Sequence, residues 1–560
     1  MKRCDSPKFC RFAAVSGRGV GPRFTAFSLT AAATLGGYGV SAVEAAEAAE
    51  PVHAVIDDAR PLHAISPLIY GSNHEVEGYE FGDARRLGGN RLTPYNWEVD
   101  ASNAGKDYQH QHDRWLSGNT WWHDLDEPET NRPAGTPGAS VLRFHDESLQ
   151  RGAYSLVTVP LAGFVAADAE GPVGEDEAAP SPRWARTAAD SEGAAMSLDD
   201  GRVYADQLVA HLTERYGKAG TARGIGGYSL DNEPALWHKT HPRLHPEQVT
   251  CQELLNKSIA TAQAVKSVDP GADVFGPALW GMTAYATLSN AADWDALRER
   301  EGYDWFIDAY LDRMREASDR AGHRLLDVLD VHWYTENPKG RAWTGPEVAQ
   351  AAKVLYEPGY AEDNWVGKHF ARFLPLLPKM QASVDRYFPG TKLALTEYDW
   401  PQTDTVYGGL AQADALGAMG RHGVYFASYH HYSWEKPDRY VGSAFALYRN
   451  ADGRGLAFGD TALPVQLAGG ADVSVYAARD DAVGSLHVIA INREDRPTPL
   501  RLELTSARPG GAEAWFFDGQ DPAPRAADPA SVGLAVDADG VVSLELPAYS
   551  AWHVRLRLAD

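Results

Sequence analysis

The chain has 560 residues, more than one ordinary domain needs, so a large domain and a smaller one are expected. Its formal net charge is -24, which argues against a nucleic-acid partner and is compatible with a neutral ligand such as a polysaccharide. Tyr (25) and Trp (16) are abundant, which indicates either large cores or surfaces that stack on sugar rings.

The first 46 residues have the composition of a leader. Basic residues precede an uncharged stretch at 25–43, and mainly small residues follow at 44–49, where a signal peptidase could cleave. A permanent membrane anchor is the alternative, but glycines and alanines make the stretch weakly apolar for spanning a bilayer. We predict a signal peptide over residues 1–46, a secreted or periplasmic protein, and no membrane association once the leader is removed.

Between residues 65 and 455, short apolar runs alternate with amphipathic runs of helical period. Eight of the apolar runs have the length of strands, and their alternation with helices predicts a closed (β/α)₈ barrel. Active sites in such barrels lie at the carboxyl ends of the strands. The predicted strands are Leu68–Gly71, Gly88–Leu92, Ser155–Leu161, Gly226–Leu230, Asp273–Gly276, Val328–Trp333, Leu393–Thr396 and Tyr425–Tyr429.

The pattern changes after about residue 455, where short alternating strands follow one another without a helical run. Turn-forming residues separate these strands, which predicts a small all-β sandwich over residues 456–560. Residues 47–64 are expected to belong to the same sandwich. The predicted strands are Val473–Ala477, Ser485–Asn492, Leu500–Leu504, Ala514–Phe517, Val541–Leu546 and Trp552–Leu556.

Two glutamates follow the fourth and seventh predicted barrel strands. Glu233 stands in Asp231-Asn232-Glu233-Pro234, and Glu397 directly follows Thr396. Strands four and seven lie roughly opposite each other in an eight-stranded barrel, so the two side chains can converge. Retaining glycosidases need two carboxylates about 5–5.5 Å apart. We predict Glu233 as the acid/base and Glu397 as the nucleophile; a surface acid and a buried ion pair are the respective alternatives.

Other polar residues at predicted strand ends could assist these glutamates. Asn232 is expected to hydrogen-bond a sugar 2-OH, and Arg91 to orient the nucleophile carboxylate and keep it ionised. His332 or Tyr334 could hold Glu397 by a hydrogen bond. The alternatives are an ordinary salt bridge for Arg91 and satisfied core polar groups for the other two.

Four aromatic residues are candidate sugar-stacking platforms. Trp434 follows the eighth predicted strand and suits the floor of the subsite before the cleaved bond. Tyr108, Trp280 and Trp365 stand on predicted loops. Packing inside the protein is the alternative for each.

The predicted chemistry needs no cofactor. Glu175, Asp176 and Glu177 could form a calcium loop, although three adjacent acids are more often simply solvated. The histidines show no convincing metal-ligand spacing.

At these residues the chain resembles glycoside hydrolase family 44. The resemblance implies a clan A barrel with a β-sandwich that cleaves β-1,4-glucans such as carboxymethyl cellulose and xyloglucan with retention. It implies the acid/base role for Glu233 and the nucleophile role for Glu397. The stretches that carry it are Ile65–Gly71, Arg86–Thr93, Tyr95–Trp97, Gly171–Glu177, Tyr228–Trp237, Thr240–Pro242 and Phe458–Asp460.

The resemblance is not complete, because family members often carry a tryptophan where Tyr108 stands. Two alternatives in function remain open. A xylanase or mannanase on the same barrel is expected to use the same two catalytic carboxylates. A non-catalytic glycan-binding protein would instead be expected to lack one of them. The expected partner is a polysaccharide, and the expected oligomeric state is a monomer.

Overall fold

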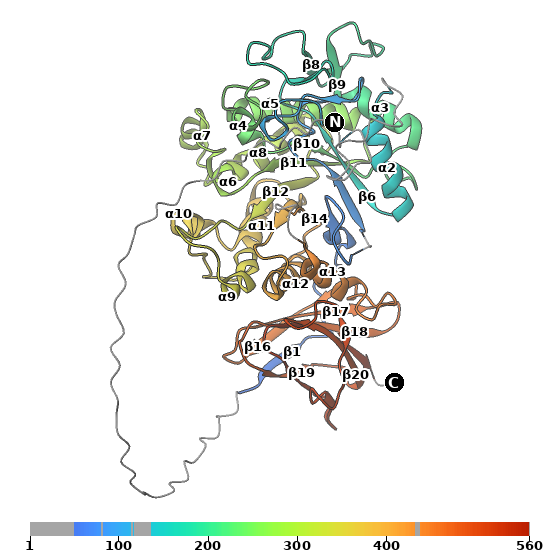
Figure 1. Cartoon of the computed structure of the whole chain (residues 1–560), viewed down its shortest axis with the longest axis vertical. Helices are drawn as coiled ribbons and strands as arrows, with labels where there is room; N and C mark the ends of the chain where they lie inside the picture. Colours follow the sequence, from blue (N-terminus) through green and yellow to red (C-terminus); the bar gives the residue numbers. More distant parts are fainter. Residues whose placement is uncertain (1–49, 80–81, 114–115, 117–135, 432–436, 559–560) are drawn as a thin grey trace, which may run out of the picture. The chain divides into compact units, whose positions relative to one another are not determined.

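The structure is a computed structural model that describes residues 50–79, 82–113, 116, 136–431 and 437–558 (Figure 1). The predicted signal peptide lies outside these residues. Among the helices of the described part, none combines the length and the apolar composition that crossing a membrane requires.

Eight parallel strands close a barrel, with helices between them along the chain (Figure 1). This confirms the predicted fold class. The barrel strands are β2 (Gly71–Ser72), β3 (Ala84–Leu87), β6 (Tyr154–Val159), β10 (Gly227–Leu230), β11 (Asp273–Leu279), β12 (Val328–Tyr334), β13 (Lys392–Asp399) and β14 (Phe426–Tyr429).

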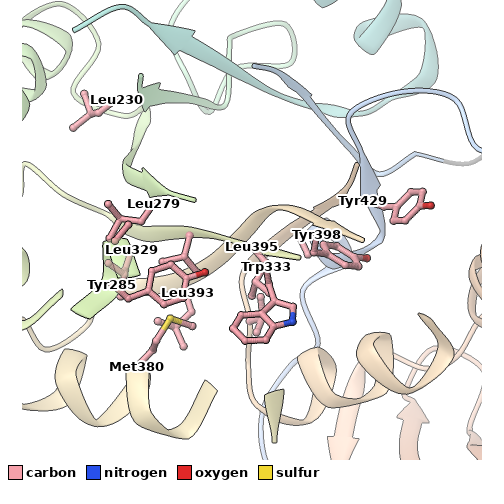
Figure 2. Packing of buried hydrophobic residues seen from close by; sticks show 14 of the residues in the cluster. Leu230, Leu279, Tyr285, Leu329, Trp333, Met380, Leu393, Leu395, Tyr398 and Tyr429 are labelled. Atoms are coloured by element: carbon pink, nitrogen blue, oxygen red, sulfur yellow. The ribbon is translucent and has the colours of Figure 1, made fainter. Parts of the chain in front are cut away.

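The barrel strands read as continuous apolar runs because both of their faces are covered. Every residue of β10 and β14 is buried, as is every residue of β13 after Lys392. Figure 2 shows side chains of the barrel strands gathered with those of flanking helices, including Met380 near Leu393. The longer helices are α2 (Ala139–Arg151), α3 (Ala205–Tyr216), α5 (Cys251–Val268), α8 (Phe306–Ala321), α11 (Leu376–Tyr387), α12 (Val406–Arg421) and α13 (Arg439–Arg449).

The first two barrel strands lie elsewhere than the sequence predicted. Residues Pro67–Tyr70 form a 3-10 turn, because Ser66 Oγ accepts a hydrogen bond from Leu68 N and a proline opens the turn, so β2 begins only at Gly71. The prediction of a strand at Gly88–Leu92 is wrong, since that stretch forms a turn after β3.

Insertions at the carboxyl end of the barrel carry their own small sheets. A two-stranded ribbon, β4 (Tyr95–Asn96) with β5 (Ala101–Ser102), follows β3. A three-stranded sheet follows β6 and consists of β7 (Phe164–Ala166), β8 (Trp184–Ala188) and β9 (Arg202–Tyr204). These insertions lengthen the loops on the face where barrel enzymes bind substrate.

Two further sheets pack around a second hydrophobic core. The N-terminal strand β1 pairs with β16 on one side and with β19 on the other, so the start of the described chain lies in a sheet of C-terminal strands. One sheet has the order β16 (Val465–Ala468), β1 (Val52–Ile56), β19 (Thr498–Leu504), β23 (Val542–Leu546) and β22 (Ala535–Val536). The other has the order β15 (Thr461–Leu463), β17 (Val473–Asp480), β18 (Ser485–Asn492), β24 (Ser550–Leu558), β20 (Pro509–Asp518) and β21 (Arg525–Ala526).

Candidate active site

Two glutamates stand at the carboxyl end of the barrel on backbone that the fold fixes. Glu233 follows β10 with left-handed dihedral angles (φ 46°, ψ 53°), and its N–H donates to the Ala278 carbonyl at 3.0 Å. Asp231, two residues earlier, is also left-handed with φ 64°. Left-handed backbone is uncommon outside glycine and is concentrated at functional sites. Glu397 lies within β13, where the pairing of this strand with β12 changes register.

The carboxylates of Glu233 and Glu397 face each other. One oxygen of each and a ring nitrogen of His332 all lie within 4.8 Å of one another. Retaining glycosidases hold their carboxyl groups about 5–5.5 Å apart, whereas inverting enzymes hold them about 6.5–9.5 Å apart. The spacing therefore favours a retaining mechanism.

Charged and polar partners hold the Glu397 carboxylate at both oxygens. Arg86 Nη1 donates to Oε1 at 2.7 Å, and the Tyr334 hydroxyl donates to Oε2 at 2.6 Å. Burial alone would raise the pKa of Glu397, but the positive charges of the neighbouring His332 and Arg86 outweigh it and hold this pKa below its usual range. Glu397 is therefore ionised, as its predicted role of nucleophile requires.

The Glu233 carboxyl has a different environment. His332 Nδ1 lies 2.9 Å from its Oε1 and 3.5 Å from Oε2 of Glu397, so this imidazole bridges the two acids. Burial raises the pKa of Glu233, the hydrogen bond from His332 opposes this, and the charge of Glu397 adds to the rise. The net rise keeps Glu233 protonated at a higher pH than an exposed glutamate. Two carboxyl groups with pKa values pushed apart can divide the acid and nucleophile roles.

Asp231 fixes the turn that presents Asn232 and Glu233. It is fully buried and accepts hydrogen bonds from Thr93 Oγ1 at 2.6 Å and from the Asn232 N–H at 2.7 Å. The Asn232 side chain itself accepts from Arg86 Nη2 at 2.8 Å. The predicted position of Asn232 beside the acid is thus observed, and its contact with a sugar stays a prediction.

The arginine that contacts Glu397 is Arg86, which the sequence did not single out. The predicted residue, Arg91, instead lies 2.5 Å from Asp113 in a salt bridge and stacks over the Tyr108 ring at 5.8 Å. The correction follows from the position of β3, because Arg86 points into the barrel from that strand. The run Arg86-Leu87-Gly88-Gly89 was the available signal, since the Arg86 guanidinium lies against Gly88.

The predicted sugar-stacking aromatics have partners within the protein. Trp280 Nε1 donates to Ser289 Oγ at 3.0 Å, and Trp365 meets Phe370 edge-on at 5.6 Å. Tyr108 is half-buried beneath Arg91. Trp434 lies outside the described residues. Their roles as subsites stay predictions.

The predicted calcium loop has internal partners for one of its acids. Glu177 accepts from the Gly174 N–H at 2.8 Å and pairs with Arg183 at 3.2 Å. Among the described residues, ligand atoms converge in two other groups, which are Glu233 with His332 and Glu397, and His74 with His431 and Asp438. Calcium binding at Glu175, Asp176 and Glu177 stays a prediction.

Comparison with known proteins places this geometry among glycoside hydrolases. The sequence signature of glycoside hydrolase family 44 matches residues 101–337. Endoglucanase A of Paenibacillus lautus is 44% identical over 531 residues, which span 91% of this chain and 73% of that protein. Beta-mannanase/endoglucanase A of Caldicellulosiruptor saccharolyticus is 40% identical over 488 residues, 82% of this chain and 36% of that protein.

Solved structures agree with the sequence relatives. A family 44 xyloglucanase of Paenibacillus polymyxa, solved with xyloglucan, superposes with a TM-score of 0.84 at 40% identity, covering 91% of this chain and 100% of that chain. Cel44A, a family 44 endoglucanase from Clostridium thermocellum, gives a TM-score of 0.82 at 41% identity, covering 90% of this chain and 99% of that chain.

Proposed function

This chain belongs to glycoside hydrolase family 44, and from that premise we propose how its site works. The enzyme is a retaining, endo-acting hydrolase of β-1,4-glucan linkages in cellulose-type polymers and xyloglucan. Glu397 is its nucleophile and Glu233 its general acid and base. The observation that carries the assignment is the convergence of one oxygen from each carboxyl within 4.8 Å, with pKa values shifted in opposite directions.

In the first step, a Glu397 oxygen attacks the anomeric carbon while the bond from that carbon to the leaving oxygen breaks. Glu233 gives its proton to the leaving oxygen, and a glycosyl ester of Glu397 forms. Arg86 and Tyr334 keep the attacking carboxylate ionised and fix its plane.

In the second step, Glu233 takes a proton from water, and the resulting hydroxide oxygen bonds to the anomeric carbon. The ester bond breaks and the Glu397 carboxylate is restored. Two inversions give net retention, so NMR should first show the β-anomer of the product. Initial appearance of the α-anomer would exclude this mechanism.

Replacing the nucleophile tests its assignment directly. Glu397→Ala should lower kcat on carboxymethyl cellulose by about 1,000-fold or more, because the ester can no longer form. Azide should restore part of the turnover by entering the space left by the carboxylate. Glu299→Ala, at an exposed position of α7 (Trp294–Glu301), is the matched control and should keep wild-type rates. Wild-type activity in Glu397→Ala would remove this residue from the mechanism.

The acid role of Glu233 predicts a dependence on the leaving group. Glu233→Gln should lose about 100-fold or more on polymers, whose leaving alcohol needs a proton, but much less on an aryl glycoside with an acidic phenol. Equal losses on both substrates would contradict the acid role.

The preferred polymer is a further part of the proposal. A xyloglucanase and a protein named for both mannanase and endoglucanase activity are among the relatives, which supports xyloglucan and makes mannan an alternative substrate. Xylan is a second alternative, because a xylanase on the same barrel would use the same two carboxylates. Initial rates on xyloglucan, carboxymethyl cellulose, xylan and glucomannan, measured side by side, decide between them. The leader composition supports export, and the chemistry proposed here requires no cofactor.

A further inference from the structure

We propose that His430 is a positioning residue that acts on the nucleophile through Tyr334. This inference rests on the proposed function, because it takes Glu397 as the nucleophile. His430 follows β14 and Tyr334 ends β12. The Nδ1 atom of His430 lies 3.1 Å from the Tyr334 hydroxyl oxygen, and the two rings meet edge-on with centroids 6.4 Å apart.

The direction of the hydrogen bonds follows from counting protons. The Tyr334 hydroxyl has one proton, and its 2.6 Å contact with the ionised Glu397 carboxylate takes it. The hydroxyl oxygen can then only accept from His430, so Nδ1 of His430 carries a proton. The result is a chain of two donations, from His430 to Tyr334 and from Tyr334 to Glu397.

Neighbouring groups hold the His430 ring in this orientation. Its backbone N–H donates to the Tyr398 carbonyl at 3.0 Å, and the His74 ring meets it edge-on at 5.8 Å. Burial lowers the pKa of His430, while the charge of Glu397 opposes that shift. A neutral ring protonated at Nδ1 donates to Tyr334 without adding a charge to the site.

The chain of donors bears on the nucleophile in two ways. A donor on the tyrosine oxygen polarises its O–H bond and strengthens the hydrogen bond to Glu397. It also fixes the phenol, so that Oε2 of the carboxylate has a fixed partner, as Oε1 has in Arg86. Loss of His430 should therefore slow formation of the glycosyl ester and make Glu397 easier to protonate.

The test uses two replacements that differ in where they place a donor. The amide nitrogen of asparagine occupies the place of Nδ1, whereas that of glutamine occupies the place of Nε2. With 2,4-dinitrophenyl β-cellobioside as substrate, His430→Gln should lower kcat about tenfold with KM within about twofold. His430→Asn should recover most of that loss. The acid limb of the kcat/KM profile should move to higher pH in His430→Gln, which a merely structural role would not cause.

A double-mutant cycle with Tyr334→Phe decides whether the effect passes through the tyrosine. If it does, adding His430→Gln to Tyr334→Phe should cost less than about twofold. If the losses in kcat caused by His430→Gln and Tyr334→Phe multiply in the double variant, the inference is overturned. A raised KM with unchanged kcat in His430→Gln would also overturn it and would point to a direct sugar contact. Thermal melting of each variant checks that the fold is intact. If His430→Gln is destabilised, the kinetics of His430→Asn are compared with those of the wild type instead, and a near-wild-type kcat in that variant supports the inference.

Glu397→Ala, assayed in parallel, separates the two hypotheses. Wild-type turnover in that variant would defeat the proposed function. Inactive Glu397→Ala together with a wild-type rate and pH profile in His430→Gln would defeat only the role of His430.

Discussion

The Arg86 guanidinium joins the two halves of the catalytic site. One of its nitrogens donates to Glu397 at 2.7 Å, and the other donates to Asn232, the neighbour of the acid, at 2.8 Å. The side chain is fully buried, so water cannot replace either contact. A lysine offers a single point of charge and cannot span both partners.

Arg86→Lys should therefore lower kcat/KM on xyloglucan by about 100-fold, because Glu397 loses its fixed orientation and Asn232 loses its donor. The acid limb of the kcat/KM profile should move to higher pH, since the Glu397 carboxylate becomes easier to protonate. Arg91→Lys is the matched control and should cost only a few-fold, because Arg91 pairs with Asp113. Equal losses in the two variants would show that Arg86 has no special role.

Sequence reasoning found the residues near the carboxyl ends of two long apolar strands and missed the arginine in a short strand. Glu397, His332 and Tyr334 were predicted because each stands at or near the end of an apolar run. Arg86 was missed because a charge in the middle of Ala84–Leu87 argues against a buried strand. Only the partners across the barrel explain how that charge is tolerated, and sequence spacing does not show them.

At the scale of elements, the turn after β3 leaves room for the Arg86 guanidinium at Gly88. A Cβ atom on Gly88 would stand 2.3 Å from Arg86 Cζ and 2.5 Å from its Nη1. Real Cβ atoms do not approach other atoms so closely, so a larger residue must displace the guanidinium. Glycine at position 88 thus supports the proposed catalytic arrangement by leaving room for Arg86.

Gly88→Ala should reduce kcat/KM about tenfold or more through a shifted Arg86, and its melting temperature should fall by a few degrees. Gly82→Ala is the matched control, because among the described residues a Cβ there meets only the Ala84 carbonyl oxygen, at 3.9 Å. Assays of both variants on carboxymethyl cellulose give the comparison. A Gly88→Ala enzyme as active as Gly82→Ala would mean that the turn adapts without moving Arg86.

The continuously buried strands were predictable and the others were not. β6 and β10–β14 coincide with predicted apolar runs, because nearly every residue of these strands is buried. β2 has only two residues and follows a 3-10 turn, so it leaves almost no pattern of its own. Gly417 of α12 is explained by packing against the C-terminal sheets, since a Cβ there would stand 2.2 Å from the ring of Tyr476 in β17.

At the scale of the whole molecule, the C-terminal sheets are joined to the barrel through buried polar groups. Arg493, next to β18, donates to Asp414 of α12 at 2.8 Å, and the Tyr476 hydroxyl donates to the same carboxylate at 2.7 Å. Both charged side chains are almost fully buried, so removing either partner would leave a costly unpaired charge. The sequence predicted these strands but could not show which of their residues face a helix of the barrel.

Two buried histidines, His487 and His553, lie at the same junction, and the donor or acceptor role of each of their ring nitrogens follows from its partner. His553 Nδ1 donates to the Leu447 carbonyl at 2.7 Å, so its Nε2 accepts from His487 Nδ1 at 2.8 Å. His487 Nε2 then accepts from Ser485 Oγ at 2.8 Å. Both rings are neutral in this arrangement, and a proton added to Nε2 of His553 would point at the N–H of His487.

This arrangement predicts that acid weakens the fold. Burial lowers the pKa of His487 to about 4 and that of His553 to about 3, whereas an unfolded histidine titrates near 6.5. Below about pH 6.5 the unfolded chain therefore binds more protons than the folded one, and stability falls as the pH drops towards 4. Between pH 7 and pH 5 the loss should be about 2 kcal/mol for each histidine.

Urea unfolding at pH 7 and pH 5 measures this loss, with the double variant His487→Gln/His553→Gln as the comparison. The variant should be less stable at pH 7, because glutamine cannot reproduce the donor chain. Its stability should nevertheless change less between the two pH values, by roughly 4 kcal/mol for the pair, since it has no imidazole at either position. All other titratable groups are shared and cancel in the difference. Identical pH dependence in the two proteins would show that the histidine pair does not set the acid limit of the fold.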